Sequence, residues 1–152
     1  MFWLESQSPT AAHWAELQYG RLFAMPDPSA TRLILIADCE VPRRLRDETT
    51  RIVGFLIARH VAGEWELENI VVAEEFRGKG AGTQLMEALL AHARQTKSES
   101  VFLEVRESNV AARKLYEKLG FEEIGRRKSY YTSPLEDAVL YSKNLGAREI
   151  SI

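Results

Sequence analysis

The apolar residues of the chain fall into short runs whose spacing predicts the order of strands and helices. Two runs rich in branched residues, 33–37 and 52–58, are typical of strands covered on both faces. The run 65–73 predicts a third strand, and from about Ala81 to Gln95 apolar residues recur at helical spacing. This part of the chain therefore predicts three strands followed by a helix.

The second half of the chain predicts a further strand, a helix and a final set of strands. Residues 100–106 alternate, with branched and leucine side chains on one side and Phe, Glu and Arg on the other. Asn109 has the chemistry of a helix N-cap, and Gly120 is the kind of residue that ends a helix. The last strands are predicted at residues 121–124, around residues 130–131 and at residues 138–142.

The N-terminal third has a looser pattern. Residues 2–5 predict a short first strand, and a helix predicted to begin at Pro9 stops before Pro26. The charged residues 38–51 predict a solvated hairpin loop, with a docking surface as the alternative. The complete order is strand, helix, three strands, helix, strand, helix and two strands, which predicts an α/β fold with a mixed sheet.

Size and charge narrow the class of protein. A length of 152 residues with 45% hydrophobic residues predicts a single domain, residues 1–152, with a sizeable core. Lys and Arg total 20 and Asp and Glu total 22, so the net charge of −2 predicts no direct binding to nucleic acid. The first residues lack the basic region and apolar core of a signal peptide, and no stretch approaches 18 apolar residues. We therefore expect a cytoplasmic protein with no membrane segment.

The residues that most often bind metals are sparse. Cys39 is the only cysteine, which excludes an internal disulfide and a thiolate cluster and suits a reducing compartment. His13, His60 and His92 are isolated, and no pair of them has the spacing of metal ligands. No metal is expected.

A glycine-rich stretch separates the third strand from the first long helix. Residues 77–83 read Arg-Gly-Lys-Gly-Ala-Gly-Thr. Glycine at every second position lets the backbone curl tightly and leaves its N–H groups open to a ligand. At a helix start these amide donors have no partner within the helix and lie at the positive end of its dipole. The stretch therefore predicts a site for a phosphate or pyrophosphate.

The alternative for this stretch is a glycine-rich turn without a ligand. The flanking cations Arg77 and Lys79 favour the anion site. Two better-known phosphate loops are excluded, because their sequence patterns are absent here. A dinucleotide fingerprint needs its third glycine three residues after the second, and a Walker loop ends in Gly-Lys-Ser/Thr.

The glycine-rich stretch resembles the acyl-CoA pyrophosphate loop of the GNAT N-acetyltransferases. Residues 103–109, Leu-Glu-Val-Arg-Glu-Ser-Asn, and 115–121, Leu-Tyr-Glu-Lys-Leu-Gly-Phe, resemble the second half of the GNAT site. They are most similar to the RimI-type protein N-terminal (ribosomal-protein alanine) acetyltransferases, as are the tyrosine pair at 130–131 and Glu-Asp-Ala at 136–138. The resemblance is specific from residue 68 to residue 145, and it implies the GNAT fold.

The resemblance implies acetyl-CoA as cosubstrate and no metal. It assigns the glycine loop to the pyrophosphate, and the backbone of the strand edge at 69–72 to the pantetheine amides and the acetyl carbonyl. Asn109 is assigned to the pantetheine arm in addition to its helix cap, with capping alone as the alternative. The residues implied for acetyl-CoA are Ile70, Val71, Val72, Arg77, Gly78, Lys79, Gly80, Ala81, Gly82, Thr83 and Asn109.

Acetyl transfer to an amine needs a base, an oxyanion donor and a proton for the departing thiolate. The resemblance assigns the base to Glu104, acting directly or through water, and the acid to Tyr116. A tyrosine pKa of about 10 suits a thiol whose own pKa is about 8.5. The alternatives are a solvated cross-strand charge at Glu104, paired with Arg106, and a core tyrosine at position 116.

The resemblance implies that the acceptor is the N-terminal α-amine of a protein, that of a ribosomal protein. An α-amine, with a pKa of about 7.7–8, needs less help from a base than lysine, with a pKa of about 10.4. Tyr130 and Tyr131 would wall the acceptor peptide, or else pack within their strand. Two other functions stay open. One is an acetyltransferase for a lysine or a small amine, and the other is a non-catalytic acyl-CoA sensor that binds partners through residues 38–51. No motif indicates an oligomeric state.

Overall fold

The structure, a computed structural model, describes Gln7, residues 31–40 and residues 50–146. The strand predicted at residues 2–5 and the helix predicted from Pro9 lie outside these residues. The described elements are β1 (Thr31–Glu40), β2 (Thr50–Val61), β3 (Glu64–Val72), the short 3-10 helix η1 (Glu74–Phe76), α3 (Ala81–Gln95), β4 (Ser100–Arg106), α4 (Val110–Lys118), β5 (Glu122–Thr132) and β6 (Leu135–Asn144).

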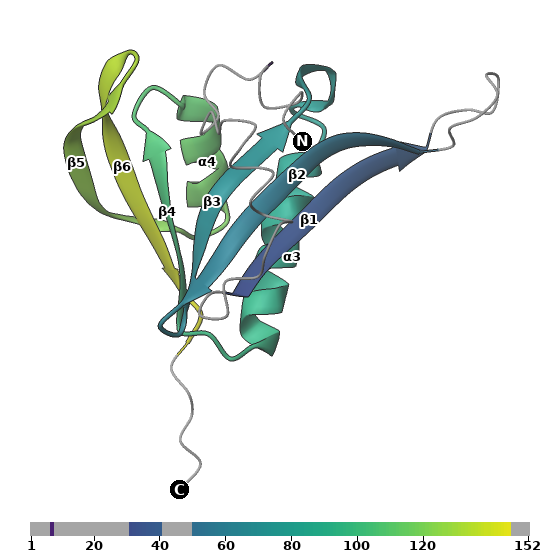
Figure 1. The fold of residues 1–152 in the computed structure, drawn as a ribbon, viewed down its shortest axis with the longest axis horizontal. Helices are drawn as coiled ribbons and strands as arrows, with labels where there is room; N and C mark the ends of the chain where they lie inside the picture. Colours follow the sequence, from purple (N-terminus) through teal and green to yellow (C-terminus); the bar gives the residue numbers. More distant parts are fainter. Residues whose placement is uncertain (1–6, 8–30, 41–49, 147–152) are drawn as a thin grey trace, which may run out of the picture.

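The described strands form one six-stranded sheet in the order β1-β2-β3-β4-β6-β5 (Figure 1). Every neighbouring pair is antiparallel except β3 and β4, which run parallel. Parallel neighbours need a crossover connection, and α3 provides it. The predicted α/β fold with a mixed sheet is confirmed.

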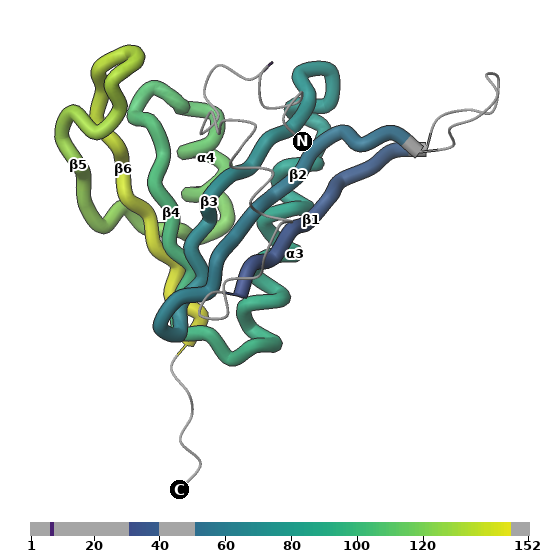
Figure 2. The backbone as a smooth tube through the Cα atoms, in the orientation of Figure 1, coloured from purple at the N-terminus to yellow at the C-terminus, as the bar shows by residue number. Residues whose placement is uncertain are grey.

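The β3–β4 junction is short, and this opens the sheet. The two strands pair only from Trp65–Val101 to Leu67–Leu103. Beyond that point they diverge toward their C-terminal ends, as the backbone trace in Figure 2 makes plain. The pairing of β2 with β3 skips Glu68, so β3 carries a bulge just where it leaves β4. An extra residue bends a strand, and this bend directs the rest of β3 away from its neighbour.

The main core lies between the sheet and the helices. Leu85, Met86, Leu89 and Leu90 form the buried side of α3, which contacts strands β1 to β4. The leucine spacing predicted this face, because residues three and four apart share one side of a helix. A second buried cluster, Phe55, Ile57, Val71 and Ala73, forms on alternate residues of β2 and near the end of β3.

Several sequence predictions are confirmed by the described elements. The first long helix was predicted at about 81–95, and α3 has those bounds. Asn109 caps α4, with its side-chain oxygen accepting a hydrogen bond from the Ala112 amide at 3.2 Å. Gly120 follows α4 with a positive φ of 80°, as a helix-ending glycine should. In the described part of the chain, no helix has the length and apolar character needed to span a membrane.

Other predictions were wrong in detail. The run 33–37 is not covered on both faces, since the Ile36 residue is 53% exposed. Its strand, β1, stands at the edge of the described sheet and pairs only with β2. The predicted loop 38–51 is shorter than expected, because β1 continues to Glu40 and β2 begins at Thr50. The stretches predicted at 121–124 and around 130–131 belong to one strand, β5, which begins at Glu122.

Candidate active site

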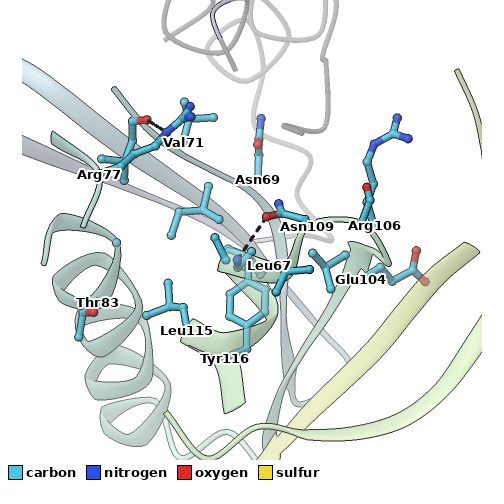
Figure 3. A pocket seen from close by; sticks show the side chains of 18 of the residues that line it. Leu67, Asn69, Val71, Arg77, Thr83, Glu104, Arg106, Asn109, Leu115 and Tyr116 are labelled. Atoms are coloured by element: carbon cyan, nitrogen blue, oxygen red, sulfur yellow. Dashed lines mark hydrogen bonds between the residues drawn. The ribbon is translucent and has the colours of Figure 1, made fainter. Parts of the chain in front are cut away.

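The divergence of β3 from β4 creates a large open cleft of about 1160 Å³. Its walls come from the separated ends of the two strands, the glycine loop, the first turn of α3, α4 and the tyrosine pair of β5. Figure 3 shows side chains from β3, β4, α3 and α4 converging on this space. The fold therefore brings the two sequence motifs, which are about 20 residues apart, to one place.

The glycine loop forms one end of the cleft. Gly78 and Gly80 have φ values of 70° and 92°, in the left-handed region that favours glycine. A Cβ atom added at either position would have no neighbour within 4 Å. Gly80 is also the N-cap of α3 and carries no capping side chain, so the first-turn amides of α3 keep their hydrogen-bonding capacity. This end of the cleft has the geometry of an anion site.

The third glycine of the loop, Gly82, is explained by helix packing and not by the anion site. A Cβ atom at Gly82 would lie 3.4 Å from the Leu115 side chain, so this glycine allows α3 and α4 to approach closely. Arg77 folds back on the strand before it, and its Nε donates to the Val72 carbonyl oxygen at 3.0 Å (Figure 3). The Lys79 ammonium lies 5.4 Å from the centroid of the Phe76 ring, a cation–π contact.

Glu104 enters the cleft from β4, on the face of the strand opposite the buried Val101, Leu103 and Val105. Its carboxylate forms an ion pair with the Arg127 guanidinium of β5, at 3.1 Å. The Glu104 side chain is 15% exposed and that of Arg127 is 53% exposed. Glu104 is therefore a largely enclosed carboxylate, and the long, half-exposed side chain of Arg127 contacts it.

Tyr116 reaches the cleft from α4 and is also part of the core (Figure 3). It is 3% exposed, and its ring packs near those of Phe121 and Tyr141, with centroids 6.0 and 6.2 Å away. Burial raises the pKa of Tyr116 above its ordinary value, with a smaller contribution from Tyr131. The phenol thus keeps its proton throughout the neutral and mildly alkaline range.

The tyrosine pair lies where β5 is irregular. Pairing with β6 passes from Arg127–Ala138 directly to Tyr131–Glu136, so β5 has two more residues than its partner there. Ser129 within this bulge has a φ of 50°, and its amide donates to the Asp137 carboxylate at 2.8 Å. The bulge presents Tyr130 and Tyr131 to the cleft with their rings edge to face.

The tyrosine pair is electrostatically coupled to Glu104. The Glu104 carboxylate is the main cause of a raised pKa of Tyr130. Burial, followed by Glu104, raises the pKa of Tyr131 to about 12. A negative charge disfavours a second negative charge close by, so both phenols stay neutral donors beside the carboxylate.

Arg106, the partner suggested for Glu104 by the alternative interpretation, is engaged elsewhere. Its Nη1 donates to the Glu136 carboxylate at 2.8 Å, and both side chains are nearly buried. The hydrogen bond from Arg106 holds the pKa of Glu136 below its ordinary value. The guanidinium also lies 4.1 Å from the centroid of the Tyr131 ring. The pair with Arg106 that the alternative interpretation suggested is therefore not formed, and Arg127 is the partner of Glu104.

The cleft contains almost all of the residues singled out from the sequence. Ile70, Val71, Val72, Arg77, Gly78, Gly80, Gly82, Thr83, Glu104, Asn109, Tyr116, Tyr130 and Tyr131 line it, whereas Lys79 and Ala81 do not. Sequence reasoning gave no role in the cleft to Glu66, Phe76 or Leu115, which also line it. Asn69 was assigned only as part of the strand edge; it is a polar residue inside an apolar run, and in the structure it is 4% exposed.

No group of three or more His, Cys, Asp or Glu side chains in the described ranges could hold a metal ion. The polar side chains that line the cleft are carboxylates, phenols, arginines, a lysine, hydroxyls and side-chain amides.

Comparison with known proteins agrees with this geometry. Residues 4–121 match the family model described as the Acetyltransferase (GNAT) family. A curated [Ribosomal protein bS18]-alanine N-acetyltransferase of Haemophilus influenzae is 41% identical over 87 residues, which are 57% of this chain and 59% of that protein. The protein of the same name from Escherichia coli K12 is 38% identical over 92 residues, 59% of this chain and 62% of that protein.

The matched part spans less than two thirds of the length of these curated relatives. A solved structure covers more of the chain. The crystal structure of the ribosomal-protein-S18-alanine N-acetyltransferase from Escherichia coli superposes with a TM-score of 0.75 and 26% identity, covering 99% of this chain and 89% of that one. Because the family model matches well over half of its residues, the chain belongs to the GNAT acetyltransferase family.

Proposed function

We propose that this protein transfers the acetyl group of acetyl-CoA to the N-terminal α-amine of a protein, with Glu104 as the base and Tyr116 as the acid. The observation that carries the proposal is that one cleft contains the anion-binding geometry of the glycine loop together with Glu104 and Tyr116. The curated relatives named as alanine N-acetyltransferases support an α-amine of a ribosomal protein as the acceptor. A ribosomal acceptor suits a cytoplasmic enzyme.

The cleft fits acetyl-CoA, which would supply the activated acetyl thioester. The open space above Gly78 and Gly80 leaves room for a pyrophosphate against the amides of α3. The edge of β3 from Ile70 to Val72 lies beyond its pairing with β4, so its backbone groups face the cleft without a strand partner on that side. Such an edge suits the amide groups of a pantetheine arm, and Asn109 lies close enough to line the same space.

Glu104 would accept the proton of the acceptor ammonium, directly or through water. It is a carboxylate on a rigid strand, and its side chain is largely enclosed. An α-ammonium, with a pKa of about 7.7–8, gives up its proton readily enough for a carboxylate to act near neutral pH. The resulting amine is the nucleophile.

Tyr116 would return a proton to the departing thiolate. Its hydroxyl is still protonated when it is needed, because burial raises its pKa. The core interpretation of Tyr116 is compatible with this role, since the packing of its ring against Phe121 and Tyr141 would hold the hydroxyl in place. Tyr130 and Tyr131, which line the cleft near Glu104, would flank the acceptor peptide.

A peptide panel tests the acceptor class. We expect acetyl transfer to peptides with a free α-amine, above all to those that begin with alanine. We expect little transfer to peptides whose N-terminus is blocked and whose amine is on lysine, since a lysine ammonium, with a pKa of about 10.4, is harder to deprotonate. Mass spectrometry locates the added acetyl group, and acetylation of lysine alone would reject the proposed acceptor.

The glycine loop can be tested with a matched pair of variants. Gly80 and Gly63 have φ values of 92° and 91°, and an added Cβ atom would meet nothing within 4 Å at either position. Both Gly→Ala changes should therefore cost similar stability, about 1–2 kcal/mol for a left-handed alanine. Gly80→Ala alone should weaken acetyl-CoA binding, by about ten- to a hundredfold if one hydrogen bond to a charged group is lost.

Calorimetric titration of the two folded variants measures this difference. Gly63 lies in the turn between β2 and β3, outside the cleft lining, so Gly63→Ala should bind acetyl-CoA like the parent. Equal affinities for Gly80→Ala, Gly63→Ala and the parent would remove the glycine loop from the binding site.

A further inference from the structure

Arg127 places a cation of the protein itself against the carboxylate that the proposed function uses as base. Its guanidinium is 3.1 Å from Glu104 and lies 5.4 Å from the centroid of the Tyr130 ring. The same carboxylate is the one that an acceptor ammonium would have to approach. Arg127 therefore occupies, at Glu104, the electrostatic position of a substrate cation.

Arg127 is held more loosely than the other two arginines of this region. Arg106 is nearly buried, and its guanidinium is fixed by Glu136 and the Tyr131 ring. Arg126, the residue next to Arg127, forms ion pairs with two carboxylates, those of Glu123 and Glu107. The Arg127 side chain is more than half exposed. The guanidinium therefore keeps part of its hydration while it contacts the enclosed Glu104 carboxylate, so moving it fully into water costs little on the side of the cation.

The bulge of β5 explains why Arg127 is available for this position. Regular pairing of β5 with β6 ends at Arg127–Ala138, and the two additional residues follow at once. The Ser129 amide is hydrogen-bonded to Asp137, which keeps the bulge in place. Arg127 thus stands on a fixed backbone with a long side chain that can swing into solvent without disturbing a strand pair.

We infer that Arg127 is a displaceable counter-ion for Glu104, so that acceptor binding at this site is an exchange of one cation for another. The inference rests on the proposed function, in which Glu104 meets the acceptor ammonium. Arg127 is a positioning residue here: it touches Glu104 and not the acceptor. When an ammonium enters, the guanidinium leaves the carboxylate for water. After transfer, Glu104 gives the proton that it accepted from the ammonium to water, the neutral acetylated product departs, and the guanidinium returns to the carboxylate.

The charged substrate can therefore replace Arg127 at Glu104, whereas the neutral product cannot. An acetylated N-terminus carries no positive charge and cannot replace a guanidinium at a carboxylate. The neutral product therefore cannot keep Arg127 away from Glu104, since the ion pair is available whenever the ammonium is absent. The cost is that every acceptor must compete with Arg127 to bind.

Steady-state kinetics of Arg127→Ala tests this competition. Without the resident cation, the KM for a free α-amine peptide at low ionic strength should fall by about two- to fivefold, the range of a weak ion pair whose cation is exposed. The kcat should change little, because the carboxylate and the phenol are untouched. Arg127→Lys keeps the charge and should return the KM toward that of the parent. Added salt should shrink the difference between parent and Arg127→Ala, because exposed charges are screened.

Two controls separate competition from simple removal of bulk. Arg126→Ala removes the same charge from the neighbouring residue and should leave the KM of the peptide unchanged. A peptide that lacks the α-amino group but is otherwise identical serves as a competitive inhibitor. Its Ki should be the same for the parent and Arg127→Ala, because a neutral ligand does not displace the guanidinium.

Three results would overturn the inference. One is a KM for the amine peptide that stays constant or rises in Arg127→Ala, which would make Arg127 irrelevant or a direct binding contact. Another is an equal fall in the Ki of the peptide without the amino group, which would point to steric relief. The third is a parent protein without activity on any α-amine peptide, which would remove the proposed function and this inference together. An active parent with an unaltered Arg127→Ala would remove the inference alone.

Discussion

Replacing Glu104 with glutamine is expected to leave acetyl-CoA affinity nearly unchanged and to lower kcat by about 10²–10⁴, the range for a positioned general base. Glutamine preserves the shape and the hydrogen-bonding reach of glutamate but does not accept the proton of an ammonium at neutral pH. Binding of acetyl-CoA depends on the other end of the cleft, where the glycine loop lies. Binding and turnover should therefore separate, and calorimetry together with stopped assays would measure the two quantities.

The pH profile of Glu104→Gln adds a second signature. Free amine becomes more abundant as the pH rises, so the variant should recover part of its rate toward pH 9. The recovery should be larger for an α-amine, with a pKa of about 7.7–8, than for lysine, with a pKa of about 10.4. A parent-like rate and pH profile in Glu104→Gln would disprove the base assignment, and Glu68, which also lines the cleft, would be tested next.

The Arg127→Ala variant distinguishes the role of Glu104 as a base from its ion pair with Arg127. Glu104→Gln also removes the ion pair with Arg127, so a loss of rate in this variant alone does not distinguish loss of the base from loss of the ion pair. Arg127→Ala removes the contact and keeps the carboxylate. If Glu104 is the base, only Glu104→Gln loses turnover, whereas equal losses in both variants would assign the effect to the ion pair.

Replacing Tyr116 with phenylalanine is expected to lower kcat by about 10²–10⁴, the range for a positioned general acid. The ring and its packing against Phe121 and Tyr141 are retained, so the melting temperature should stay close to that of the parent. The parent phenol is protonated across the usual assay range, because burial raises the pKa of Tyr116. The loss should therefore be the same from pH 7 to pH 9.

Tyr141→Phe is the matched control for the phenol. Tyr141 belongs to the same core cluster but does not line the cleft, and its hydroxyl donates to Glu117 at 2.6 Å and accepts from Arg113 at 3.2 Å. Removing that hydroxyl should lower stability by about 1 kcal/mol, the usual net worth of one hydrogen bond, with little effect on kcat. If Tyr116→Phe instead loses stability and keeps its turnover, Tyr116 is a core residue and another group protonates the thiolate.

The order of the described elements was predictable, because the apolar residues of each helix or strand recur at the period of that element. The alternation at 100–106 and the helical spacing at 81–95 both reappear as β4 and α3. The exposure of Ile36 was not predictable in the same way. Whether a strand lies at the edge or in the centre of a sheet depends on its partners, and the branched run 33–37 says nothing about them.

The candidate site was predictable to the extent that its parts are local in sequence. The glycine loop is continuous, so its spacing alone indicates an anion site at a helix start. The partner of Glu104 is on another strand, and neighbouring residues gave Arg106 as the obvious candidate instead of Arg127. Ion pairs between strands depend on sheet order and on the bulge of β5, and neither is recorded in the spacing of charges along the chain.

The bulge of β5 also bears on how the molecule behaves among copies of itself. β5 is an outer strand of the described sheet, so one side of its backbone has no strand beside it. A long regular edge of this kind is a template for pairing with another chain and hence for aggregation. The two additional residues interrupt its regularity, and Arg126, Arg127 and Lys128 place three positive charges along it. The irregularity that brings a cation and two tyrosines to Glu104 thus also prevents the sheet from continuing into a neighbouring molecule.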